Sequence, residues 1–485
     1  MSLVALFFFS PLILIIIHAW RSNKRSNTSL HIPKGSTGWP FIGELIPFLK
    51  PHPSIHMSPF IEQRISKYGK IFRSQILGRQ VIFSRDAELN RIVLQNTGQV
   101  FKIDWPMNFK GLFGKYNISL LEGEAHRVNR SLYVSFLSLE RVRGGLLREV
   151  DRQASLILDS WKENSLVYFK EETRKFAFNT AFKFVMNCDA NNPEVDQLRG
   201  EYINLNKGMV SLPFNFPGTT YRKALQVFSF ILSRSNVLKY INQKVKERQQ
   251  QINDGCEGNA DDLLSFLLNQ IALSEEEIAD HLLSFIFAAH DTLSSVIPLA
   301  IYFLEGCQRA VDQLREEHLH IRKMMESRGE TELNWTDYKQ MEFTQCVINE
   351  TLRLGNVVRY LPRTVTKTIQ FKGYDIPSGY TVMPAVAAVH MDPSLFDDPQ
   401  CFNPWRWQRE SSSPARNNNL MSFGGGQRLC PGMEFAKVEL SVFIHRLVLA
   451  YVWETEEPDP PMALPMVDFA RGLPMKIRPY MSPIV

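Results

Sequence analysis

No two cysteines in this 485-residue chain stand at the CxxC spacing that zinc sites and redox motifs use. The six cysteines are Cys188, Cys256, Cys307, Cys346, Cys401 and Cys430. Because they lie far apart, a disulfide framework or a structural zinc site is not expected. Unpaired thiols of this kind are typical of a reducing compartment.

Long blocks of lysine and arginine and zinc-finger spacings are also absent, which argues against a nucleic acid partner. The net charge of +5 is only mildly basic and suits a surface that meets acidic phospholipid or an acidic protein. No GxGxxG unit opens a βαβ pattern and no flavin motif is present, so any flavin chemistry must come from another chain. No internal repeat is found. The 44% of hydrophobic residues is that of an ordinary globular protein with a large core.

The N-terminus carries a long apolar run, LVALFFFSPLILIIIHAW, from Leu3 to Trp20. About 20 such residues span a bilayer as a helix, and the lysine and arginines directly after the run place that side in the cytosol. We therefore predict a single-pass transmembrane anchor over residues 1–20, with the body of the protein on the cytosolic side of the membrane. A cleaved signal peptide is the alternative. Against it, no positive charge precedes the run and no small-x-small cleavage site follows.

The rest of the chain divides into a connecting segment and one large domain. Residues 21–45 form a basic hinge rich in proline and glycine, which predicts a stiff connection of fixed angle. Short apolar runs between Lys70 and Ser84 predict strands, and helical periodicity dominates from Ser131 onward. The clearest helix opens at the capping box of Ser274 and Glu277 and runs for about 30 residues, or roughly 45 Å. Residues 46–485 are therefore expected to be mainly α with small β-sheets.

A glycine-rich turn holds Cys430 in the stretch MSFGGGQRLCPGMEFAKVEL. Its three consecutive glycines allow a sharp turn and a close approach to a flat ligand, and their N–H groups can point at sulfur. The helix predicted after Cys430 places a positive helix end near the sulfur, which favours a thiolate. Arg428 lies close enough to meet an anionic group on the rim of a ligand. A turn with an incidental cysteine is the alternative, but the full pattern Phe423-x-x-Gly426-x-Arg428-x-Cys430-x-Gly432 is far more specific.

This pattern resembles the haem-binding loop of the cytochrome P450 family, the haem-thiolate monooxygenases. The resemblance implies a cytochrome P450 fold and haem b as cofactor, with Cys430 as the metal ligand and Phe423 and Arg428 in the cofactor site. An axial thiolate pushes electron density onto iron and favours O–O cleavage. The resemblance also implies electrons from NADPH, delivered by a separate flavoprotein reductase.

Two further stretches fit the same family. ETLR places Glu350 and Arg353 at i and i+3, and FNPWRW contains Arg406. Alone, such a pair is common on solvated helices and is worth a few tenths of a kcal/mol. The resemblance implies instead a buried Glu–Arg–Arg cluster that holds the core near the cysteine loop, which is a structural role.

The middle of the long helix reads Ala288-Ala289-His290-Asp291-Thr292. Asp and Thr are poor choices there because both compete for backbone hydrogen bonds, and a solvated polar patch is the alternative. The resemblance implies that this helix crosses the oxygen-binding face of the haem, where Thr292 hydrogen-bonds the oxygen and Asp291 supplies protons. Ala289 stands where the family commonly has glycine, and its methyl group is expected to narrow the oxygen groove.

Cationic groups are expected wherever the two haem carboxylates are buried. His126 and Arg130 stand at i and i+4, and YLPRTV contains Arg363. With Arg428 they match positions that neutralise the haem propionates in the family. For His126 an ordinary surface histidine is the alternative.

Several runs, among them FKGYDIPSGY and VDFARGLPMKI, are similar to plant steroid enzymes, and most to the sterol side-chain 22-hydroxylases of brassinosteroid biosynthesis. This resemblance implies a sterol or steroid substrate and the endoplasmic reticulum membrane. Lys207–Tyr221 is a candidate apolar lid, with a plain inter-helix loop as the alternative. The candidate pocket walls are Ala288, Ala289, Val357, Val358 and Leu473, for which plain core positions are the alternative.

Three other functions stay open from the sequence. The first is a monooxygenase that acts on another plant terpenoid. The second is a haem enzyme of the same fold that rearranges peroxides without a reductase, against which the Asp291–Thr292 pair argues. The third is a non-catalytic haem- or sterol-binding membrane protein.

Overall fold

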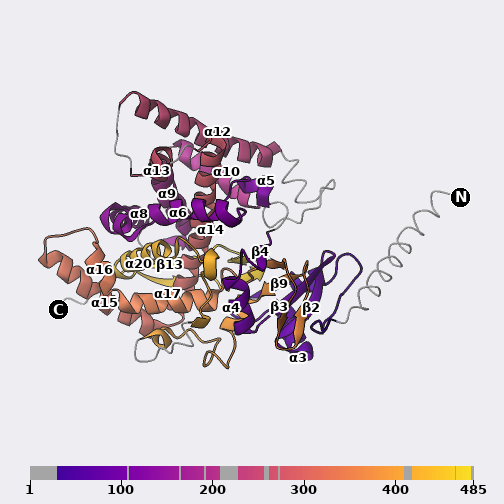
Figure 1. Ribbon diagram of the computed structural model, residues 1–485. Helices are drawn as coiled ribbons and strands as arrows, with labels where there is room; N and C mark the ends of the chain where they lie inside the picture. Colours follow the sequence, from indigo (N-terminus) through magenta and orange to yellow (C-terminus); the bar gives the residue numbers. More distant parts are fainter. Residues whose placement is uncertain are drawn as a thin grey trace, which may run out of the picture.

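The computed structural model describes residues 30–105, 109–162, 165–189, 193–207, 228–255, 261–270, 273–408, 418–464 and 466–481. Helices make up most of it, and the largest sheet lies to one side, beside α3 and α4 (Figure 1). The expectation of a mainly α protein with small sheets is confirmed. The predicted anchor over residues 1–20 and the lid over residues 207–221, apart from the backbone of Lys207, lie outside the described residues.

The helices follow one another along most of the chain. The longer ones are α3 (Pro59–Tyr68), α4 (Ala87–Gln95), α6 (Gly123–Phe136), α8 (Leu147–Asp159), α9 (Phe169–Met186), α10 (Pro193–Lys207), α12 (Phe228–Asn253), α13 (Leu263–Gln270), α14 (Glu275–Glu305), α15 (Gln308–Ser327), α17 (Glu342–Gly355) and α20 (Met433–Ala450). The short ones are α2 (Leu45–Phe48), α5 (Phe109–Phe113), α7 (Leu139–Arg141), α16 (Trp335–Gln340), α18 (Val386–His390), the π-turn η2 (Val142–Leu146) and the 3₁₀ turns η3 (Pro404–Trp407) and η4 (Gly426–Arg428).

The strands form four small sheets among the described residues. The largest has the order β2 (Ile71–Ile76), β3 (Arg79–Ser84), β9 (Thr381–Pro384), β6 (Arg363–Val365) and β4 (Phe101–Ile103), and only its β3–β9 pair is parallel. The others are β10 (Tyr451–Thr455), β13 (Pro474–Pro479) and β5 (Leu166–Tyr168); β1 (His52–Pro53), β11 (Met462–Leu464) and β12 (Met466–Asp468); and β7 (Ile369–Phe371) with β8 (Tyr374–Ile376).

The strands predicted between Lys70 and Ser84 are confirmed as the hairpin β2–β3. Ile71 pairs with Ser84 and Ile76 pairs with Arg79. The two turn residues, Leu77 and Gly78, both have positive φ, at 47° and 77°. Two positive φ values match the twist of a tight hairpin, although leucine is an unusual residue for the first of them.

The predicted long helix is α14, and it runs through the main hydrophobic cluster. Its capping box is present, because the Ser274 hydroxyl accepts a hydrogen bond from the Glu277 N–H while the Glu277 carboxylate accepts one from the Ser274 N–H. Of the helices in the described ranges, only α14 is long and apolar enough to cross a membrane, but 67% of its most apolar window is buried inside the protein. It packs against α9, α12, α17 and α20, as a core helix does.

The described part of the hinge is bound to the edge of the largest sheet. Ser36 N–H donates to the Arg73 carbonyl, and Glu44 N–H donates to the Gln75 carbonyl. A Cβ atom on Gly43 would lie 2.0 Å from the Gln75 oxygen, so only glycine fits this close approach. The stiffness expected of this segment therefore comes from backbone pairing with β2 as well as from its prolines.

Candidate active site

The turn that holds Cys430 is closed by its own backbone. The Cys430 N–H donates to the Phe423 carbonyl over 3.0 Å, and the Gly424 N–H donates to the Met421 carbonyl over 2.9 Å. Gly424 and Gly426 have φ of +77° and +63°, which L side chains rarely adopt. The helix predicted after the cysteine is confirmed as α20.

Gly426 lets this turn pack against α4. A Cβ atom at Gly426 would lie 2.3 Å from the Leu94 carbonyl oxygen, which is far too close. At Gly426, the absence of a side chain therefore lets the turn lie against the backbone of α4. The N–H group that reaches the Cys430 sulfur belongs to Gly432 rather than to one of the three consecutive glycines.

Burial sets the acidity of the Cys430 thiol in the protein itself. Burial raises the pKa of Cys430, while the Gly432 N–H and the Arg130 charge act in the opposite direction. The Gly432 N–H lies at the start of α20, so the helix end acts on the pKa of Cys430 in the expected direction, although burial is the larger effect. A bound metal ion deprotonates a coordinating thiol outright, so these lesser effects then support a thiolate.

Three arginines and a histidine gather beside Cys430. Arg428 donates to the Leu121 and Ile118 carbonyls, and Arg363 donates to the Thr97 hydroxyl and the Pro362 carbonyl. The Arg428 charge lowers the pKa of Arg363 to about 10, after burial as the larger cause. Burial also lowers the pKa of Arg130 and that of Arg428; the Glu122 charge raises the pKa of Arg428, and the Arg130 charge lowers it.

This cation cluster, which we define as His126, Arg130, Arg363 and Arg428, forms no ion pair with a carboxylate of the described ranges. His126 is buried and does not lie on the surface. Burial, followed by the charges of Arg428 and Arg130, lowers the pKa of His126 to about 4. At neutral pH its imidazole is therefore uncharged and offers a hydrogen bond, whereas the three arginines offer charge.

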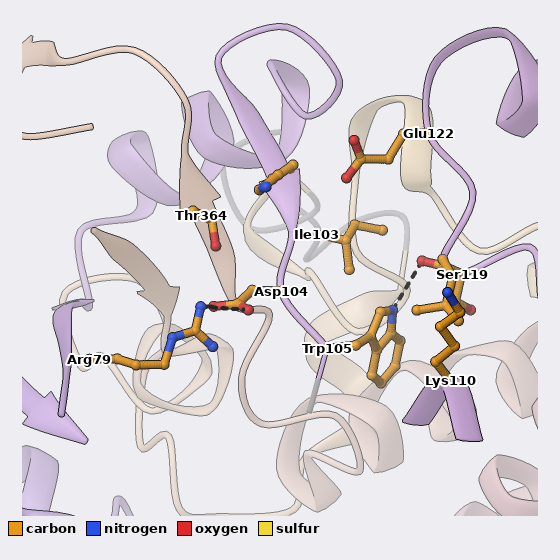
Figure 2. A pocket seen from close by; sticks show the side chains of 10 residues that line it. Arg79, Ile103, Asp104, Trp105, Lys110, Ser119, Glu122 and Thr364 are labelled. Atoms are coloured by element: carbon orange, nitrogen blue, oxygen red, sulfur yellow. Dashed lines mark hydrogen bonds and ion pairs between the residues drawn. The ribbon is translucent and has the colours of Figure 1, made fainter. Parts of the chain in front are cut away.

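A cleft of about 400 Å³ is lined by residues of β3, β4, β6 and α5 and of the segment before α6 (Figure 2). Its lining includes Glu122, which follows the Leu121 carbonyl that Arg428 contacts, and Thr364, which follows Arg363 in the chain. In Figure 2 the Arg79 side chain pairs with Asp104, and the Trp105 indole donates to the Ser119 carbonyl over 3.1 Å. Most of the residues that line the cleft are polar or charged.

The centre of α14 exposes one narrow face. Ala288 and Thr292 are exposed, Ala289 is half-buried, and most of the helix on either side is buried. Residues four apart lie on the same face of a helix, so Ala288 and Thr292 form a small accessible surface on a helix that is otherwise mostly buried. The Thr292 hydroxyl donates to the Ala288 carbonyl over 2.8 Å, which leaves its oxygen able to accept a hydrogen bond on that face.

Asp291 is oriented differently from Thr292. Its carboxylate lies 2.9 Å from Nδ1 of His290, a side chain that is 2% exposed. The Asp291 carbonyl also accepts from the Ser295 hydroxyl over 2.9 Å. Hydroxyl groups that donate to carbonyls one turn earlier often bend a helix slightly. Such bonds are expected at the polar middle of this helix, which the sequence predicts.

The expected Glu–Arg–Arg cluster is assembled and fully buried. The Glu350 carboxylate accepts hydrogen bonds from Arg353 and Arg406, and the pairs lie 2.7 and 3.1 Å apart. The sequence missed two further donors, the Asn403 N–H and the Trp407 indole. Trp407 follows Arg406 directly, so the FNPWRW run itself contained the signal.

His390 is a second residue that the sequence did not reveal. Its Nε2 accepts from the Met421 N–H over 3.0 Å, and its Nδ1 lies 2.7 Å from the Asn356 side-chain oxygen. It therefore ties the start of the cysteine turn to the end of α17. No local pattern marks it, because both partners are more than 30 residues away.

A family model described as Cytochrome P450 matches residues 33–481 of the chain. This chain belongs to the cytochrome P450 family. Its cofactor is haem b, and NADPH supplies the electrons through a reductase, as is standard for this family.

Similar proteins cover nearly the whole of this P450. It is 48% identical to a cholesterol 22-hydroxylase of Paris polyphylla, with 96% of each chain covered. It is 46% identical to a steroid (22S)-hydroxylase of Brachypodium distachyon, covering 97% of this chain and 95% of that one. It is 44% identical to a cholesterol 16,22-dihydroxylase of Trigonella foenum-graecum, with 97% of each covered. The retinoic acid-bound cyanobacterial CYP120A1 matches with a TM-score of 0.81 and 26% identity over 93% of this chain and all of that one.

The residues around Cys430 suit haem. Arg363 is buried and Arg130 and Arg428 are half-buried, and none of the three forms an ion pair with a carboxylate in the described ranges. Such a group matches a ligand with two carboxylates, and the one thiol beside it suits iron. Cys430 would hold the metal. Arg363, Arg428 and the neutral His126 would hold the carboxylates, and the Arg130 charge lies close to Cys430 and His126. The Phe423 carbonyl anchors the Cys430 N–H.

The candidate pocket walls lie in different surroundings. Val358 is partly exposed, and Val357 is buried next to it. Leu473 is fully buried and has a positive φ of 54°, and its N–H donates to Asp459. These contacts favour a core position for Leu473, whereas Val358 stays a candidate wall residue.

Proposed function

We propose that this P450 hydroxylates the side chain of a sterol or steroid at C-22, in brassinosteroid or related plant steroid biosynthesis. The support for the substrate is the names of its relatives, which are cholesterol and steroid 22-hydroxylases at 44–48% identity over nearly the full chain. The support for the reaction class is the Cys430 turn beside the cation cluster. Haem bound through Cys430 supplies the dioxygen chemistry, in which one oxygen atom enters the substrate and the other leaves as water.

The chain's own residues would divide the remaining tasks. Arg363, Arg428 and His126 hold and orient the cofactor by its carboxylates. Thr292 offers a hydrogen-bond acceptor on the exposed face of α14, and Asp291 is the nearby source of protons. Ala288 keeps that face free of bulk, and the Ala289 methyl group, half-buried beside it, limits the width of the groove.

The direct test is reconstitution with a flavoprotein reductase, NADPH and a panel of phytosterols, followed by mass spectrometry of the products. We expect an NADPH-dependent gain of one oxygen on the side chain. Binding of sterol without turnover would point to the binding protein, and turnover of other terpenoids alone would point to that alternative. Position analysis also separates C-22 from the 16,22-dihydroxylation in the name of one relative.

Thr292→Ala is expected to lower the yield of product per NADPH consumed by about 10-fold or more, because the acceptor on the exposed face of α14 is lost. The missing electrons should appear as hydrogen peroxide, which a peroxidase assay measures. Thr292→Ser keeps the hydroxyl and serves as the control. Equal coupling in the alanine variant and the wild type would contradict the role of this hydroxyl.

We also propose that residues 1–20 anchor the enzyme as a single-pass span in the endoplasmic reticulum membrane, with the catalytic domain in the cytosol. The described surface just after the span supports this. It exposes Trp39, Phe41, Ile42 and Ile46, an apolar patch on a segment that would leave the bilayer. Aromatic side chains are enriched at membrane interfaces.

Removal of residues 1–20 is expected to reduce the membrane-bound fraction and to leave haem binding intact. In the truncated protein, the double substitution Trp39→Asp and Ile46→Asp should release most of the protein that is still membrane-bound, because a charged side chain is costly to place at the membrane surface among apolar groups. Flotation on phospholipid vesicles measures both steps. A truncated protein that stays fully bound would show that the span is not the main attachment.

A further inference from the structure

His290 has no place in the roles assigned so far, although it lies at the centre of α14. Its side chain is 2% exposed. Two aromatic rings cover it edge to face. Phe178 of α9 lies 5.9 Å away at an interplanar angle of 89°, and Tyr202 of α10 lies 5.1 Å away at 84°. A buried imidazole is costly unless it makes hydrogen bonds, so its partners indicate its purpose.

The hydrogen-bond partner of this imidazole is the next residue in the chain. Nδ1 of His290 lies 2.9 Å from Oδ1 of Asp291. An ionised carboxylate only accepts hydrogen bonds, so the proton of this contact belongs to Nδ1. The other ring nitrogen, Nε2, is buried and has no hydrogen-bond partner within the described ranges. Within the described ranges, the contact with Asp291 is therefore the one hydrogen bond of this ring.

This contact fixes where the carboxylate points. Successive residues on an α-helix are about 100° apart, so Asp291 does not share the face of Ala288 and Thr292. The carboxylate is turned toward His290, whose ring contacts Phe178 of α9 and Tyr202 of α10, and its side chain is only 20% exposed. Because the rings of Phe178 and Tyr202 confine the imidazole, the imidazole in turn confines the carboxylate.

We propose that His290 is a positioning residue that sets the location of the Asp291 carboxylate and thereby its proton supply to Thr292. This inference rests on the role proposed for Asp291. The Nδ1–H group holds one carboxylate oxygen, and the aromatic pair holds the imidazole. Helices α9 and α10 thus determine the position of the proton-donating group through the imidazole.

A double-mutant cycle tests this inference. The variants are His290→Leu, Asp291→Asn and the double variant, and the readout is product formed per NADPH consumed. We expect His290→Leu to lower this ratio roughly 3- to 10-fold, less than the 10² or more expected when a proton-transferring group is itself removed. In the Asp291→Asn background the same change should have no further effect, because its partner is gone.

Two controls separate positioning from damage. His290→Asn keeps an N–H donor near the place of Nδ1 and should restore most of the ratio. His318→Leu removes another fully buried histidine, in α15, and should lower stability without changing the ratio. Losses that add in the double variant, or a ratio that falls equally in His318→Leu, would overturn the proposal.

A readout independent of turnover is the infrared band of ¹³C-labelled aspartate carboxylates. The Asp291 band, identified by its loss in Asp291→Asn, should shift in His290→Leu and return toward its wild-type position in His290→Asn. An unshifted band would refute the contact. Failure of the wild type to hydroxylate any sterol would instead refute the proposed function and leave the infrared result standing.

Discussion

Cys430→Ser is expected to abolish the red-shifted absorbance band that the reduced, haem-loaded protein shows with carbon monoxide. That band requires sulfur on the metal, and serine offers a weak oxygen donor in its place. Hydroxylation should fall below detection, because the axial thiolate is what favours O–O cleavage. The measurement is a reduced carbon monoxide difference spectrum, normalised to the haem content.

Cys401→Ser is the matched control, because its thiol is exposed and far from the turn in sequence. It should keep the wild-type spectrum. An unchanged band in Cys430→Ser would refute the ligand assignment. Loss of the band in both variants would show that general damage, and not ligation, is the cause.

Glu350→Ala is expected to cost about 3–5 kcal/mol of folding free energy, since it leaves buried charges without a partner. Glu350 and Arg353 have no exposed surface, and Arg406 has 5%. The carboxylate also accepts from the Asn403 N–H over 2.9 Å and the Trp407 indole over 2.8 Å. A loss of this size is a large part of the usual stability of 5–15 kcal/mol, so little folded, haem-loaded protein should accumulate.

Thermal unfolding and the yield of haem per polypeptide measure this effect. Glu326→Ala provides the comparison, because that carboxylate forms a solvated pair with Arg322 at 3.8 Å on α15. It should change stability by no more than about 0.5 kcal/mol. A stable, haem-loaded Glu350→Ala protein would show that the cluster is dispensable.

The features predictable from the sequence are those whose chemistry is local. The capping box of Ser274 and Glu277 marked the start of α14 because both partners lie within one helical turn. The pattern around Cys430 predicts the candidate site because its glycines and cysteine occupy one short turn. The β2–β3 hairpin followed from two adjacent apolar runs.

Features that depend on distant partners were not predictable. His390 bonds Asn356 and Met421, which are 34 and 31 residues away along the chain, and no periodicity announces such a contact. His290 stands in the middle of the stretch from Ala288 to Thr292, but the rings that cover it, Phe178 and Tyr202, come from two other helices. The pKa of Cys430 likewise depends on more than its local sequence. A helix end is visible in sequence, but the burial that outweighs it is a property of the packed structure.

The pairing of the segment before α2 with β2 has a practical consequence for soluble expression. This segment occupies what would otherwise be the open outer edge of the five-stranded sheet, through bonds from Ser36 and Glu44. An open sheet edge is a template for self-association. A shortened gene that starts beyond Glu44 should therefore yield aggregates, whereas one that starts near Leu30 should keep the sheet capped and the protein monodisperse.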